Sequence, residues 1–193
     1  PVTGPSLPVV SRLAVLDGSR AGDVEAAWVL RGTTSYKRYT RREEQEALDA
    51  KQPQLGRPEA TRAALIPITK SDAWWQLAQD ERRDLLEESS HHIAVGLEYL
   101  PAVARQLYHG HDLGEPFDFL AWFEYAPQDA PAFEELVDRL RTTPEWGYVE
   151  RDVDIRLACG FEQGAVHLGS CPPLGGVAAE EMLRVFNCGI GMA

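Results

Sequence analysis

Two side chains of this chain are the best candidates for chemistry, a histidine and an isolated arginine. His92 follows a cluster of acidic residues in a helical pattern and has apolar neighbours. Arg105 is the only charged residue in the stretch PAVARQLY. A guanidinium in an apolar interior must find an anion or several acceptors, and an imidazole there is able to ligate a metal. Facing one cavity, the two side chains would suit a metal-bound cofactor and a small anion. A core histidine and an Arg–carboxylate pair are the simpler interpretation of each residue alone.

Aromatic residues are dense around these two positions. We expect Trp74, Trp75, Phe119, Trp122 and Phe123 to line a flat apolar slot of porphyrin size. Aromatic residues at such spacings are also typical of a plain hydrophobic core, so the slot alone does not define a function.

A second histidine pattern lies in a glycine-containing segment. His109, His111 and Glu115 form H-x-H-x-x-x-E, a spacing found in the divalent-metal motif of cupins. Gly110 and Gly114 favour a turn over the strand that this motif needs. Cupins are also all-β proteins, whereas this chain has long helical patterns. The segment therefore predicts exposed loop histidines, and a metal site remains a distant alternative.

The elements that must position these residues follow from periodicity. Pro67 predicts that its strand lies at an edge or carries a bulge. The predicted elements are a strand over 62–69, a helical region from Ser71 to Leu100, strands over 103–108 and 117–125, an amphipathic helix over 127–141, and a strand over 148–157. This is the β-α-β-β-α-β order of a ferredoxin-like unit. The fold class is α+β, an antiparallel sheet with helices on one face.

The rest of the chain divides around this unit. Residues 1–8 predict a loose arm rich in proline. Strands over 9–16 and 25–31 and an exposed helix over 41–51 predict a shortened ferredoxin-like half within 9–61. Residues 62–158 form the complete half, and 159–193 are a tail. We expect the tail to be dispensable for folding and catalysis, because the strand ending at Leu157 completes the unit.

Composition limits the partners. The chain has 193 residues, 44% of them hydrophobic, and a net charge of −11. Such a surface repels phosphate groups, which excludes nucleic acid and anionic membranes as expected partners. No apolar run approaches the roughly 20 residues of a membrane-spanning helix. All three cysteines lie after residue 158, and no signal peptide is visible, so the expected location is the cytoplasm. The chain starts at Pro1, and a periplasmic protein with a removed leader is the alternative.

A dense resemblance covers about residues 10–158. The stretches WVLRGTTSYKRYT, AALIPITKSDAWWQ, SSHHIAVGLEYLPAVARQLY and TTPEWGYVERDVDIRLA resemble the short-subunit, dimeric branch of the chlorite dismutase family. The resemblance implies ferredoxin-like subunits of the dimeric α+β barrel type, a homodimer and a haem b cofactor. It implies conversion of chlorite to chloride and dioxygen.

The resemblance also assigns roles to single residues. His92, in SHHIA, matches the proximal histidine, and Arg105, thirteen positions later, matches the distal arginine. Glu145, in PEWGYV, matches the carboxylate partner of that histidine. Trp74 and Trp75 match tryptophans beside the haem, and Tyr39 matches a tyrosine near the propionates. By this reasoning Glu145 makes the imidazole more electron-donating, while Arg105 holds chlorite and then hypochlorite.

Two other reactions or roles fit the same fold. A coprohaem decarboxylase is the nearest, but those relatives lack the distal arginine that Arg105 matches. A haem-binding or sensing protein without turnover is the other. The sequence departs from the family at His111, where the resemblance implies a different, basic residue, and the loop that carries His111 is expected to lie outside the haem pocket. Within the tail, GGVAAEEMLRVFNCGIGMA resembles a fragment of aminoimidazole ribonucleotide synthetase that is too short to form that enzyme's site.

Overall fold

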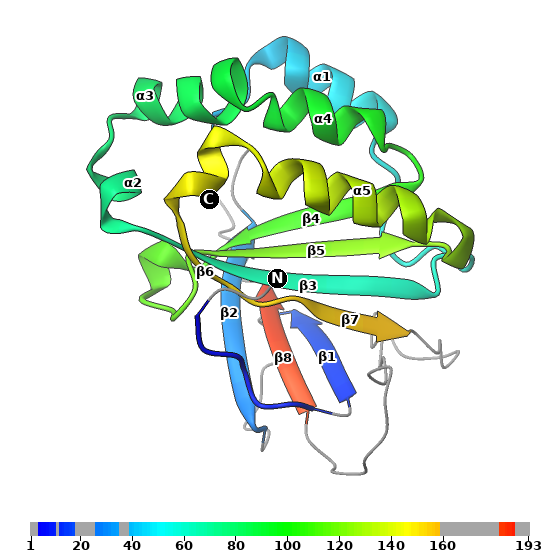
Figure 1. Cartoon of the computed structure of the whole chain (residues 1–193). Coiled ribbons are helices and arrows are strands. Elements are labelled where there is room, and N and C mark those ends of the chain that lie inside the picture. The colour runs from blue at the N-terminus through cyan, green and yellow to red at the C-terminus, as the bar shows by residue number, and fades with distance from the viewer. Residues whose placement is uncertain (1–3, 11, 18–25, 35–38, 159–181, 188–193) are drawn as a thin grey trace, which may run out of the picture.

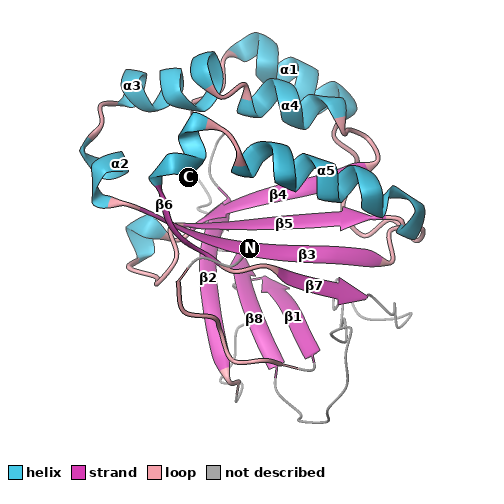
Figure 2. Cartoon of the chain, in the orientation of Figure 1, coloured by secondary structure: helices cyan, strands magenta, loops and turns pink. Residues whose placement is uncertain are grey.

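The protein is an α+β structure in which helices cover one face of a twisted sheet (Figures 1 and 2). The computed structural model describes residues 4–10, 12–17, 26–34, 39–158 and 182–187. The sheet has the order β1-β8-β2-β4-β5-β3-β6, and β7 pairs with β3 next to β6. The predicted fold class is confirmed. None of the described helices is long and apolar enough to cross a membrane.

The second half of the chain forms the predicted β-α-β-β-α-β unit. Its elements are β3 (Arg62–Lys70), a set of short helices, β4 (Val103–His109), β5 (Phe119–Tyr125), α5 (Ala130–Arg141), β6 (Val149–Asp152) and β7 (Ile155–Ala158). All pairs within this unit are antiparallel. In α5 the residues Phe133, Leu136, Val137 and Leu140 are buried, as their helical spacing predicts. They cover the sheet face on which the cavity lies.

Pro67 sits inside the sheet at a place where one partner strand is interrupted. On one side of β3 it faces Leu120 of β5, and on the other side β7 pairs only up to Leu65 while β6 begins at Ile68. The backbone oxygen of Pro67 accepts a hydrogen bond from the Val153 nitrogen at 3.1 Å, between those two strands. The missing N–H of proline therefore faces the interruption. The predicted edge position is wrong, and the register shift comes later, between Thr69 and Lys70.

The region from Ser71 to Leu100 is a series of short helices, and the prediction of one continuous helical region is wrong. It contains α2 (Asp72–Gln76), α3 (Gln79–Arg83), the π-helical turn η2 (Asp84–Ser89) and α4 (His92–Glu98). Leu77 is extended, and His91 has a left-handed backbone with φ of 51°. The buried Glu87 carboxylate accepts from the backbone nitrogens of Ile93 and Ala94 at 2.6 and 3.2 Å, which fixes where α4 begins.

The first half differs most from expectation. It contains β1 (Arg12–Asp17), β2 (Trp28–Thr34) and the helix α1 (Arg42–Lys51), which buries no residue, as predicted. Within the tail, β8 (Met182–Asn187) lies between β1 and β2 and is parallel to both. The sheet is therefore mixed, and the tail is not separate from it. Figure 1 shows these three strands running steeply across the direction of β3, β4 and β5.

The N-terminal arm is attached to the sheet. The backbone oxygen of Pro5 accepts from the Arg151 Nε at 2.9 Å, and that of Pro8 accepts from the Trp28 Nε1 at 2.9 Å. The prediction of a loose arm is therefore wrong for the described residues 4–8.

Candidate functional site

His92 opens α4 and is held by a buried carboxylate. Its Nδ1–H donates to Glu145 Oε2 at 3.2 Å, and its side chain is 29% exposed. Glu145 lies in the 3₁₀ turn η5 (Pro144–Tyr148), whose backbone is tied to Ser90 by the Glu145 N–H, which donates to Ser90 Oγ at 2.9 Å. With Nδ1 engaged, the second ring nitrogen, Nε2, is left for a ligand in the cavity that His92 lines.

Lys70 completes this arrangement. Its ammonium group pairs with Glu145 Oε1, and the two side chains are 3% and 6% exposed. Burial alone would raise the pKa of Glu145, but the hydrogen bonds and charges of His92 and Lys70 outweigh burial and lower it to about 2. Glu145 is therefore a carboxylate at any ordinary pH, and it orients the His92 ring. Sequence reasoning missed Lys70, because a lysine at the end of a strand is normally exposed.

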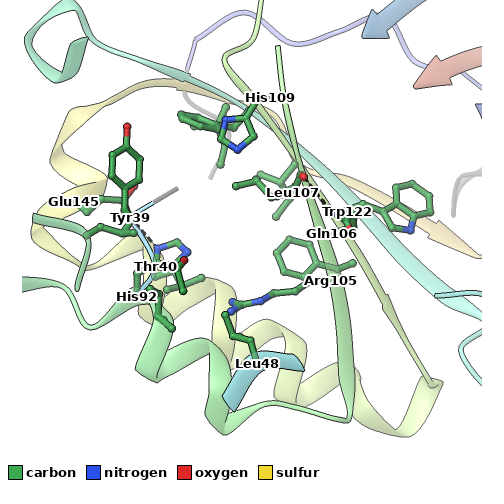
Figure 3. A pocket seen from close by; sticks show the side chains of 18 of the residues that line it. Tyr39, Thr40, Leu48, His92, Arg105, Gln106, Leu107, His109, Trp122 and Glu145 are labelled. Carbon is green, nitrogen blue, oxygen red and sulfur yellow. Dashed lines mark hydrogen bonds and ion pairs between the residues drawn. The ribbon is translucent and has the colours of Figure 1, made fainter. Parts of the chain in front are cut away.

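Arg105 reaches the same cavity from the opposite wall. It belongs to β4, and Figure 3 shows its guanidinium crossing toward the helix that carries His92. The guanidinium lies against Gly96, where a Cβ atom would overlap it. Burial lowers the pKa of Arg105, and the charge of Glu87 opposes that shift. No carboxylate of the described residues forms an ion pair with Arg105, so this cation is available to an anion. Gly96 is thus the residue that makes room for it.

The cavity between these two walls has a volume of about 420 Å³. Alternation along β4 places Arg105, Leu107 and His109 on its wall, and Figure 3 shows these three side chains along one strand. The apolar part of the wall comes from Ile66, Ile68, Leu107, Phe119, Ala121 and Phe123. Trp122 also lines it, but its indole points away (Figure 3) and packs in the core on the other face.

Among the aromatic residues predicted for the slot, Trp74 and Trp75 have different places relative to the cavity. Trp74, 1% exposed, lines the cavity with Tyr39, and their rings meet edge to face at 6.3 Å. Trp75 is not among the lining residues. Arg82 ties all three together, since its Nε and Nη2 donate to the backbone oxygens of Trp74 and Trp75 at 3.0 and 2.6 Å, and its Nη1 donates to the Tyr39 hydroxyl at 3.4 Å. Trp74, Phe119, Trp122 and Phe123 therefore line the cavity, whereas Trp75 does not and stacks on Phe119.

The two histidines of the H-x-H pattern have different environments. His109 is the last residue of β4, is 8% exposed and lines the cavity, so the prediction of an exposed loop histidine is wrong for it. His111 lies in the following turn with its side chain 41% exposed, outside the cavity as predicted. The His111 Nδ1 forms a hydrogen bond with Asp118, so the two histidines do not point to a common metal site as the cupin motif would require.

Three features of the cavity suit a flat ring that carries both a metal and carboxylates. Among the described residues there is no group of three His, Cys, Asp or Glu side chains that could bind a metal ion. A metal in this cavity would therefore need most of its ligands from a cofactor. His92 offers one axial nitrogen. The indole nitrogen of Trp74 is buried without a hydrogen-bond partner among the described residues, and it is able to donate to a carboxylate. Haem has this shape and chemistry, so the residues present fit it.

Comparison with known proteins gives consistent matches. The family model described as chlorite dismutase matches residues 14–159. The chlorite dismutase of Ideonella dechloratans is 36% identical over 86 residues, which are 45% of this chain but only 28% of that protein. The structure of a dimeric chlorite dismutase from Nitrobacter winogradskyi is 66% identical, with a TM-score of 0.66 over 67% of this chain and 75% of that one. A mutant chlorite dismutase from Candidatus Nitrospira defluvii is 27% identical, with a TM-score of 0.53 over 74% of this chain and 53% of that one.

Proposed function

Because the chain belongs to the chlorite dismutase family, we propose that it is a haem b enzyme that decomposes chlorite to chloride and dioxygen. The observation that carries this proposal is the cavity itself, which has a carboxylate-bound imidazole on one wall and an arginine without an ion-pair partner among the described residues on the other. The Nitrobacter relative is a dimeric enzyme, and we extend a homodimer to this chain.

The chain's own residues would hold the cofactor in the following way. His92 Nε2 would bind the iron, and Glu145 accepts a hydrogen bond from His92 Nδ1–H, which would make the imidazole a stronger electron donor. Lys70 keeps Glu145 ionised. The Trp74 indole N–H, which has no partner among the described residues, would be able to donate to a propionate on the side of the cavity that Tyr39 lines. Bound there, haem supplies the redox chemistry that cleaves the Cl–O bond.

Arg105 handles the anion. Its guanidinium keeps its charge and therefore binds chlorite without acting as acid or base. In this structure the guanidinium lies against Gly96, at the end of a long flexible stem that would allow it to turn toward an anion in the cavity. There it would hold chlorite in place and would keep the chlorine-containing product close to the cofactor. The apolar wall of Leu107, Phe119 and Phe123 excludes water from this step.

The test begins with the spectrum of the purified protein after addition of hemin. We expect one haem per chain with a ferric Soret band, followed by release of one dioxygen per chlorite in an oxygen electrode. A protein that binds hemin but releases no dioxygen would be a haem-binding or sensing protein. A protein that stays colourless would refute the haem proposal as well.

A further inference from the structure

A row of aromatic rings connects the protein surface with the cavity. The rings of Trp75 and His111 are stacked with centroids 3.5 Å apart and an angle of 12°. Trp75 also stacks on Phe119 at 6.0 Å and 15°, and Phe119 meets His109 edge to face at 5.0 Å. Phe119 and His109 line the cavity, whereas Trp75 and His111 do not. We call His111, Trp75 and Phe119 the ring stack.

The outer ring of this stack is held in a fixed orientation. His111 Nδ1 donates to Asp118 Oδ1 at 2.6 Å, and the Asp118 side chain is 8% exposed. The other oxygen of Asp118 accepts from the Lys70 backbone nitrogen at 2.6 Å. The backbone nitrogens of Gly110 and His111 donate to the Asp118 carbonyl oxygen at 2.8 and 3.3 Å. His111 is thus anchored to the end of β3, although its ring is half exposed.

The Trp75 indole lies between His111 and Phe119 in the ring stack. Its backbone oxygen is fixed by Arg82, whose guanidinium also lies 5.1 Å from the centre of the indole. The indole itself is not part of the cavity wall, so a bound ring would not hold it directly. His111 is the ring closest to it and lies on the solvent side.

We propose that His111 is a positioning residue, which holds the Trp75 indole against Phe119. The ring stack thereby closes the His109 end of the cavity and slows the release of bound haem. The second part rests on the proposed haem function. The first part concerns the ligand-free protein and does not depend on it.

The first experiment measures Trp75 in the ligand-free protein by near-UV circular dichroism. The difference between the wild type and Trp75→Phe gives the signal of the stacked indole. His111→Ala removes both the stack and the hydrogen bond to Asp118. His111→Phe keeps a ring for stacking, and His111→Asn keeps a donor for Asp118. Leu113→Ala is the matched control, because Leu113 is in the same turn and is 47% exposed.

We expect the Trp75 signal to be lost in His111→Ala and His111→Asn and kept in His111→Phe and Leu113→Ala, with equal far-UV spectra throughout. A signal kept in His111→Ala would overturn the proposal. A signal restored by Asn but not by Phe would show that the hydrogen bond, and not the ring, positions this turn, which would also overturn it.

The second experiment measures release of hemin from the reconstituted protein into excess apomyoglobin. An aromatic pair contributes enough that its loss should speed release about two- to ten-fold in His111→Ala and His111→Asn. His111→Phe and Leu113→Ala should stay at the wild-type rate. Equal rates in all variants would refute closure of the cavity by the ring stack. A wild type that takes up no hemin would refute the proposed function, while the dichroism would still decide the role of His111.

Discussion

Lys70→Met should strongly destabilise the ligand-free protein, because it removes one partner of a buried ion pair. The two side chains are 3% and 6% exposed, and methionine matches the shape of lysine without its charge. Glu145 would then keep a buried negative charge with His92 alone beside it. Breaking a buried pair in this way typically costs about 3–5 kcal/mol.

The pKa of Glu145 indicates how much the ionised carboxylate contributes to stability. It is lowered from 4.5 to about 2 in the folded protein. At 1.36 kcal/mol for each unit by which the pKa is lowered, the shift corresponds to about 3 kcal/mol of stability from the ionised carboxylate, including the contribution of His92. The pKa shift reflects His92 first and Lys70 second, so it sets the scale for the whole buried cluster and not for Lys70 alone.

The assay is urea unfolding at pH 7 followed by far-UV circular dichroism, on Lys70→Met, Glu145→Gln and the double variant. We expect each single variant to lower the free energy of unfolding by a few kcal/mol, and the double variant to lose less than the sum. Arg139→Met is the control, because it breaks an ion pair with Glu98 at the surface and should have a much smaller effect. Additive single effects, or a Lys70→Met variant as stable as the control, would refute this account.

Four further outcomes are expected. His92→Ala should lose tight hemin binding in a Soret titration, while His91→Asn, which suits the left-handed backbone at that position, should keep it; the reverse would shift the ligand by one residue. Arg105→Ala should keep the Soret band, weaken chlorite binding about ten- to a hundred-fold and release more hypochlorite to a trap, and Arg105→Lys should restore only part of the function. A wild-type dioxygen yield without extra trapped hypochlorite would show that Arg105 has a structural role only. Because the pKa of Glu145 is lowered to about 2, its stabilisation is complete above pH 4.5 and lost as the pH falls toward 2, and acid titration of Glu145→Gln should lack this loss. Removing residues 159–193 should lower the urea midpoint, because β8 pairs with both β1 and β2; an unchanged midpoint would show that the tail is dispensable after all.

The elements with strong periodicity could be predicted from the sequence, and those that depend on distant partners could not. The amphipathic pattern of α5 and the two aromatic strands suffice for the β-α-β-β-α-β order. Arg105 could be found because a lone charge in an apolar stretch is conspicuous. The end of the helix at His91 could not, because it depends on the Glu87 side chain reaching the next helix.

Lys70 and His109 were missed for related reasons. The partner of Lys70 lies 75 residues further along the chain, so nothing near Lys70 in the sequence indicates burial. His109 precedes a glycine, which suggests a turn, but pairing of His109 with Phe119 extends β4 by one residue and directs the ring inward. Sequence reasoning placed β8 outside the fold because its two partner strands lie at the other end of the chain.

The place of β8 also governs the order in which this protein folds during synthesis. Strands β1 and β2 leave the ribosome early, but β8, the strand between them, is made only after the β3–β7 unit. At roughly 5–20 residues per second, their facing edges stay unpaired for about 10–30 s. The β3–β7 unit is contiguous in sequence and is able to fold during that interval, with β2 attached through Thr33 and Thr34 alone. Until β8 is made, the facing edges of β1 and β2 lack their partner strand, and unpaired strand edges are able to pair with other chains.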